Sequence, residues 1–182
     1  MADFTDELKA ELFAPDDANV FAVLDGASVP DLLDRLYAPD APEWECLYRG
    51  ELAPDMAEVA PYLVALEPDH DFTDWLLAKG WGAHWGIFAT GPGELFDLRQ
   101  HFRRFLRVAG PEGESLYFRY YDPRVLRVYL PTCNAEELAE LFGEVLGSYM
   151  MEDEAAAGVL RFQNESGQLK QTEHPLKALQ KQ

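Results

Sequence analysis

The sequence predicts an α/β protein of the mixed α+β kind: a single compact domain with a mixed central sheet, short flanking helices and a C-terminal hairpin. Three observations predict this class. The chain has 182 residues, 48% of them hydrophobic, which is enough to bury a substantial core. Its first half alternates strand-like apolar runs with segments of helical period, and its second half contains two candidate hairpins.

The start of the chain predicts a helix followed by a buried strand. Apolar side chains recur at helical spacing over residues 3–13, from Phe4 to Leu12, and Pro15 is expected to end this helix. Residues 19–26 are almost continuously apolar and finish in Asp-Gly, which is typical of a buried strand that leads into a turn.

A capped helix and two strands are expected next. Ser28 precedes a helical pattern over residues 28–38 and Pro30 falls in its first turn, as is common at helix starts. The runs 44–50 and 60–68 read as the second and third strands, which completes a strand, helix, strand, strand order.

The middle of the chain continues this alternation. Asp71 and Gly80 suit the two ends of a helix within residues 70–82, because glycine accepts the left-handed conformation that closes many helices. A strand over residues 83–90 and a helix over residues 91–102 follow.

Residues 118–133, FRYYDPRVLRVYLPTC, predict a junction between a strand and a helix. A hairpin over residues 104–122 is expected to extend through Tyr121. Asp122 is placed to accept a hydrogen bond from one of the two backbone amides that follow Pro123, and the proline supplies a helical first φ.

The last third of the chain predicts one more helix and a second hairpin. Asn134 and Glu137 have capping-box spacing, and Gly143 lies just beyond the end of this helix. The runs 145–152 and 158–167 are expected to pair as strands.

A domain boundary is expected at the last hairpin. Residues 1–165 form the predicted domain, whereas residues 166–182 are polar and glutamine-rich and predict a mobile tail. At most one turn of helix is expected there, around Leu176 and Leu179.

The charge of the chain argues against several partner classes. A formal net charge of −18 disfavours general binding to nucleic acid or anionic lipid, which depends on cations. Residues 99–127, here called the basic belt, nevertheless hold seven arginines against three acids. Arginines interleaved with tyrosines could stack on single-stranded RNA. Pairing of the belt with acidic neighbouring segments is the favoured interpretation.

Neither a cofactor, a metal site nor an export signal is expected. Cys46 and Cys133 are isolated, and the motifs for dinucleotides, phosphate loops, nucleophile elbows and zinc are missing. The acidic start MADFTDELKAELF lacks the basic and apolar regions of a secretory signal. We therefore expect a cytoplasmic protein with reduced thiols.

Three residues are candidates for catalysis. Asp25 and Asp122 lie at expected strand ends, where α/β proteins often place catalytic carboxylates, and His84 could serve as a base. This is the basis of an alternative function as a small hydrolase or transferase. Turn and cap roles for the two carboxylates, and a packing role for the histidine, are the favoured interpretation.

Six segments of the chain carry a family resemblance. They are VFAVLDGA, LYRGELAPDMAEVAPYLVAL, WLLAKGWGAHWGIFATGP, LRQHFRRFLRV, YFRYYDPRVLRVYLPT and LFGEV. Their order and spacing resemble the bacterial type VI secretion effector-chaperone family, also called the adaptor or Tap/TEC family, a former domain of unknown function encoded beside VgrG spike proteins. The resemblance spans residues 20–151.

This resemblance implies a cytoplasmic adaptor that is not an enzyme, binds a cognate effector and helps to load it onto the VgrG spike. It supplies no catalytic residues. From the charge and the missing motifs, no cofactor, metal, nucleic acid or membrane partner is expected. Longer members carry a further helical lobe for which this sequence has little room, so binding is expected to rely on the shared domain or the tail. The family-signature residues, which we expect to be structural, are Gly80, Trp81, Gly82, Trp85, Gly86, Tyr121, Asp122, Pro123 and Arg124.

Overall fold

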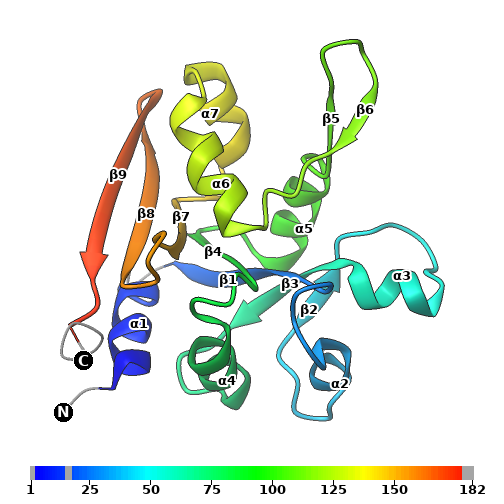
Figure 1. Cartoon of the computed structure of the whole chain (residues 1–182), viewed down its shortest axis with the longest axis vertical. Coiled ribbons are helices and arrows are strands. Elements are labelled where there is room, and N and C mark those ends of the chain that lie inside the picture. Colours follow the sequence, from blue (N-terminus) through cyan, green and yellow to red (C-terminus); the bar gives the residue numbers. More distant parts are fainter. Residues whose placement is uncertain (1–2, 15–17, 178–182) are drawn as a thin grey trace.

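Strands from both halves of the chain form one sheet that divides the molecule into two layers (Figure 1). The structure is a computed structural model and describes residues 3–14 and 18–177. Across the sheet, the strands are β2 (Trp44–Cys46), β3 (Pro61–Leu66), β1 (Asn19–Asp25), β4 (Gly86–Gly91), β7 (Ser148–Glu152), β8 (Gly158–Glu165) and β9 (Gln168–Pro175).

Every pairing between described neighbours in this sheet is antiparallel. The predicted α+β class and the C-terminal hairpin are confirmed, but the sheet is antiparallel where a mixed sheet was expected. The reason lies in the position of β1. Strands β3 and β4 run in the same direction, and β1 lies between them and pairs with both, so that no two parallel strands become neighbours.

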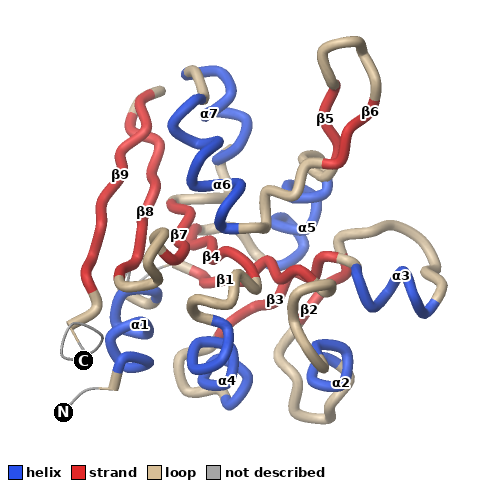
Figure 2. Tube along the Cα trace, viewed as in Figure 1, coloured by secondary structure: helices blue, strands red, loops and turns tan. Residues whose placement is uncertain are grey.

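Helices cover both faces of the sheet (Figure 2). One face carries α1 (Phe4–Leu12), α2 (Leu32–Leu36) and α4 (Asp71–Gly80), and the other carries α5 (Leu95–Arg103), α6 (Pro123–Tyr129) and α7 (Ala135–Phe142). Among the described residues, no helix is long and apolar enough to cross a membrane.

The central strand β1 contributes to the cores on both faces. Ala22 and Leu24 pack with one set of helices, while Phe21 and Val23 pack with the other. Because successive side chains of a strand point to opposite faces, a strand buried on both sides must be apolar throughout. This explains the apolar run that predicts β1.

Most predicted helices are confirmed, but their capping signals only in part: Gly80 ends α4 as expected, yet it does not adopt the left-handed conformation. The Asn134 side chain accepts from the amide of Glu137 at 2.9 Å, and the Glu137 carboxylate accepts from the amide of Asn134 at 2.8 Å, so α7 has the predicted capping box. Helix α1 ends at Leu12, and the predicted stop at Pro15 falls outside the described residues.

Two helix starts differ from the prediction. The Ser28 hydroxyl donates to the Asp25 carboxylate at 2.9 Å instead of capping α2, which begins four residues later. The N-cap of α4 is His70, whose Nδ1 accepts from the amide of Phe72 at 3.0 Å. A short helix that was not predicted, α3 (Pro54–Val59), begins with proline at its first position.

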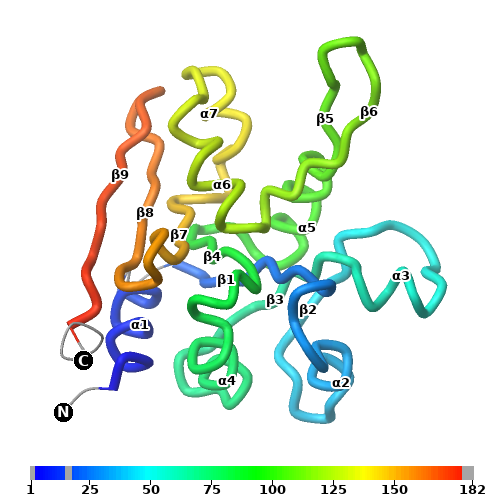
Figure 3. Tube along the Cα trace, in the orientation of Figure 1, coloured from blue at the N-terminus to red at the C-terminus, as the bar shows by residue number. Residues whose placement is uncertain are grey.

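The predicted mobile tail is wrong for residues 168–175. They form β9, which pairs with β8 along its whole length (Figure 3). Leu176 follows this strand and is 1% exposed in the core. The side chains of β9 are mostly exposed or half-buried and polar, as suits a strand at a sheet edge. A polar edge strand gives no alternating apolar signal. Leu179 lies outside the described residues.

A separate two-stranded hairpin projects from the α5 side of the sheet (Figure 1). It consists of β5 (Arg107–Ala109) and β6 (Ser115–Tyr117). The prediction that its second strand continues through Tyr121 is wrong. The pairing of β5 with β6 ends at Arg107 and Tyr117, and Tyr120 and Tyr121 lie buried in a turn before α6.

The core histidine His101 predicts a pH dependence of stability. It is 5% exposed, its Nε2 donates to the carbonyl of Leu141 at 2.8 Å, and burial lowers its pKa. The unfolded chain therefore binds a proton more readily, and stability falls as the pH drops below about 6.5. Denaturant titrations at about pH 7.5 and about pH 5.5 measure the free energy of unfolding. Its decrease between these two pH values should be smaller for His101→Gln than for the wild type. Equal losses would contradict this role.

Candidate functional site

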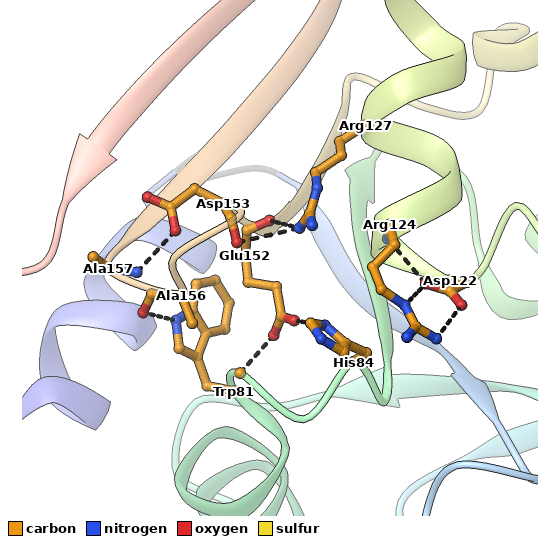
Figure 4. A network of polar contacts seen from close by, with 10 residues as sticks. Trp81, His84, Asp122, Arg124, Arg127, Glu152, Asp153, Ala156 and Ala157 are labelled. Atoms are coloured by element: carbon orange, nitrogen blue, oxygen red, sulfur yellow. Dashed lines mark hydrogen bonds and ion pairs between the residues drawn. The ribbon is translucent and has the colours of Figure 1, made fainter.

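The signature residues fall into two signature segments, residues 80–86 and 121–124, which meet in a polar corner where β1 ends, α6 begins and β7 turns into β8 (Figure 4). We use the name polar corner for Asp25, His84, Asp122, Arg124 and Glu152 with their hydrogen-bond partners. The amide of Asp25 donates to the carbonyl of Trp85 at 2.9 Å, which joins the end of β1 to the segment that leads into β4.

Asp122 caps α6 as predicted. Its Oδ1 accepts from the amide of Arg124 at 2.9 Å, and its two oxygens accept from the Arg124 guanidinium at 3.0 and 2.8 Å. Burial alone would raise the pKa of Asp122, but these hydrogen bonds outweigh it and lower the pKa. Pro123 occupies the first position of the helix and is buried. The predicted junction is therefore confirmed at Asp122 and Pro123.

Asp25 has the role of a turn residue held by an arginine. Its carboxylate, 3% exposed, accepts from the amide of Ala27 at 3.1 Å and from the hydroxyl of Ser28, and it forms an ion pair with Arg119. Arg119 comes from the basic belt, almost a hundred residues later in the chain. This pair is one case in which the belt ties an acidic segment to the corner, as expected.

Glu152 is a third buried carboxylate, which the sequence analysis missed. It ends β7, is 4% exposed and accepts from the amide of Gly82 at 2.6 Å. His84 Nδ1 donates to its other oxygen. Like Asp25, Glu152 is an acid directly after an apolar strand run, and that pattern is the signal that could have found it.

The Gly-Trp-Gly segment connects α4 to β4 and reaches the β7–β8 turn. Trp81 Nε1 donates to the carbonyl of Ala156 at 3.1 Å (Figure 4). Gly82 has φ of +81°, which favours glycine, and its amide is thereby directed to Glu152. Trp85 is half-buried against Trp75, with ring centroids 5.1 Å apart, in agreement with a packing role.

Two further signature glycines permit close approach. A Cβ on Gly80 would lie 2.7 Å from the ring of Trp85, and a Cβ on Gly86 would lie 2.2 Å from the carbonyl oxygen of Val23. The second contact is with the backbone of β1, which cannot move aside without disturbing the central sheet. These glycines therefore set the packing of α4 and β4.

The structure brings the predicted catalytic residues into one neighbourhood but gives each a separate partner. Arg124 interacts electrostatically with Asp25 and Glu152 as well as with Asp122. Asp25 is held by Arg119, Asp122 by Arg124, and His84 by Glu152. Within the described residues, no hydrogen bond or ion pair joins Asp25, His84 and Asp122 to one another, whereas a nucleophile and its base must lie within hydrogen-bond reach.

The described chain shows no metal-ligand cluster of three or more His, Cys, Asp or Glu side chains. Cys46 and Cys133 are free and half-buried, and burial raises the pKa of both thiols. A raised pKa leaves less thiolate, so neither cysteine has the activated form that nucleophilic thiols use.

The comparisons with known proteins give one match. The model of a family described as Domain of unknown function (DUF4123) matches residues 20–140, which is most of the chain and includes both signature segments. Neither the curated proteins nor the solved structures contain a match.

The cap at Asp122 can be tested by its effect on stability. Asp122→Ala removes a carboxylate that accepts three hydrogen bonds from Arg124 at the start of α6, so we expect the free energy of unfolding to fall by about 2 kcal/mol. Because the folded-state pKa is lowered, this difference is complete at neutral pH and shrinks below about pH 4. Denaturant unfolding at several pH values measures it, with exposed Asp69→Ala as the control. A change no larger than that of the control would contradict the cap.

The tight contact at Gly86 gives a second test. Gly86→Ala should lower the free energy of unfolding by about 1–3 kcal/mol, because the new methyl group overlaps the β1 backbone. Gly147→Ala is a matched control, since the nearest atom to its Cβ would be 3.5 Å away. Thermal and denaturant unfolding of both variants should separate them. Equal stabilities would show that β4 does not need this close approach.

Proposed function

The chain belongs to the DUF4123 family, and from this membership we propose that it is an adaptor of bacterial type VI secretion. In this role it binds a cognate effector in the cytoplasm and promotes loading of that effector onto the VgrG spike. The observation that carries the proposal is the family match over residues 20–140, together with the order of the signature motifs within it.

The contacts of the signature residues support an adaptor scaffold. The hydrogen bonds of these residues lie within the protein. Asp122 and Arg124 bond to each other at the helix cap, and the Gly82 amide donates to the buried carboxylate of Glu152. A catalytic site requires reacting groups that contact one another, whereas the contacts of these residues stabilise a junction between segments. We therefore propose that the corner holds the binding domain in shape and that the protein is not an enzyme.

Exposed apolar side chains offer places where partner proteins could bind. Tyr37, Val128 and Phe96 are 73%, 66% and 58% exposed. They lie on different elements, so they suit an adaptor that contacts more than one surface. Aromatic anchors of this kind are common at the centres of protein interfaces.

Co-purification tests the proposed function. The protein would be co-expressed with an effector and a VgrG spike encoded beside its own gene, and a tag on this chain would be used for capture. We expect the cognate effector to be retained through size-exclusion chromatography, and the spike to be retained when the effector is present. An effector and spike from an unrelated gene cluster are the control.

Failure to retain either cognate protein would count against the adaptor role. Asp122→Ala should lower stability while leaving capture intact below its melting temperature. If the same variant instead abolished turnover of a substrate while remaining folded, the alternative function as a hydrolase or transferase would be favoured.

A further inference from the structure

An arginine-rich pocket lies between the segment around α3 and the base of the β5–β6 hairpin. Its volume is about 350 Å³. No carboxylate lines it among the described residues, although the chain as a whole carries 33 acids against 15 bases. The side chains that define it are Arg49, Arg103, Arg104, Arg107, Leu52 and Met56.

Three of these arginines differ from the belt arginines that pair with acids. In the part of the chain that the structure describes, Arg49, Arg104 and Arg107 have no carboxylate within ion-pair distance. Arg103 instead donates to backbone carbonyls, including that of Cys46 at 2.8 Å. The guanidinium groups that face the pocket thus keep their charge available for another molecule.

The pocket continues into a second one of about 260 Å³ along α3. Tyr48, Met56 and Tyr117 line both pockets, and we call the two together the arginine groove. Among the described residues, one carboxylate lines this groove, that of Asp25 in the second pocket, and it is already paired with Arg119. Met56, Val59 and Tyr117 are 42%, 43% and 50% exposed, which is unusual for large apolar side chains that gather in one place. Arg107 lies over the Tyr117 ring, 4.8 Å from its centroid, so cation and ring form one surface.

We propose that the arginine groove binds a segment of a partner protein that carries Asp or Glu side chains beside one or two apolar anchors. The inference deepens the proposed adaptor function, on which it rests for the nature of its partner, by giving the binding a place and a chemistry. Unpaired guanidinium groups favour carboxylates, and the methionine, tyrosine and leucine side chains favour apolar anchors. Met, Tyr and Arg are also residues that protein interfaces concentrate.

A nucleic acid is the less favoured occupant. The net charge of −18 repels a long polyanion over most of the surface, and a nucleic acid would extend beyond a groove of this size. A short peptide segment places its acids only where the arginines are. Charge complementarity on this local scale increases specificity without requiring a basic protein.

Selection from phage-displayed random dodecapeptides tests the groove without knowledge of the natural partner. The wild-type protein would be the bait. A counter-selection on the Arg49→Glu/Arg107→Glu double variant would remove peptides that bind outside the groove. We expect the enriched peptides to be acidic with aromatic or aliphatic residues. Enrichment of neutral or basic peptides, or of none, would overturn the proposal.

Fluorescence anisotropy with one enriched peptide then measures the variants. Arg49→Glu and Arg107→Glu should each weaken binding about tenfold, the loss of one charge-assisted contact. Lys79→Glu makes the same charge change on an exposed face of α4 and should leave the affinity unchanged. Tyr117→Ala should weaken binding, whereas Leu116→Ala, at an exposed apolar side chain of the same strand that does not line the groove, should not. Equal effects at the groove and control positions would overturn the proposal.

Two arms separate this inference from the adaptor function. If the cognate effector or spike co-purifies equally well with the double variant, the groove inference fails and the adaptor role stands. If acidic peptides bind the groove but neither secretion partner is retained, the adaptor role fails and the groove stands.

A single-stranded oligonucleotide tests the less favoured occupant. If it binds more tightly than the enriched peptide, and the double variant loses this binding, the groove binds nucleic acid and the peptide proposal is overturned. Arg49→Gln/Arg107→Gln provides a charge-neutral variant should the reversed one unfold.

Discussion

Burial of carboxylates is the constraint on which the arrangement of this molecule depends. Asp25, Asp122 and Glu152 are 2%, 5% and 4% exposed, and a buried charge without donors costs several kcal/mol. Each therefore has donors around it, and many of these come from distant segments. Arg119 reaches Asp25, and the Gly-Trp-Gly segment reaches Glu152. Satisfying the carboxylates thus also fixes how β1, β7 and α6 meet.

The central strand makes this corner possible. Strand β1 is apolar on both faces, so its two cores hold it rigidly and its end places Asp25 at a defined point. The close approach of Gly86 to Val23 brings β4 alongside, and with it the segment that carries His84. The most specific family motifs therefore lie where sheet, helix and turn join. Their spacing within this chain thus reflects contacts inside the protein, at the junction of these segments.

Local signals in the sequence were sufficient for features that depend on neighbouring residues. The caps at Asp122 and Asn134 rest on side chains that bond two or three residues ahead, and spacing alone reveals them. Glu152 was missed because its partners, Gly82 and His84, lie 70 and 68 residues away. Strand β9 was missed because its polar side chains carry no periodic apolar signal, and only pairing with β8 defines it.

The basic belt serves two purposes that composition cannot separate. Arg99 and Arg119 pair with acidic segments as expected, with Glu45 and Asp25, while Arg127 donates to the carbonyls of the β7–β8 turn. These arginines hold the fold together. Among the described residues, Arg104 and Arg107 at the base of the hairpin form no ion pair with a carboxylate, and they lie beside exposed apolar side chains. Because the protein as a whole is strongly negative, the arginine groove favours a partner whose carboxylates lie only opposite these arginines. A longer polyanion would be repelled by the acidic surface around the groove.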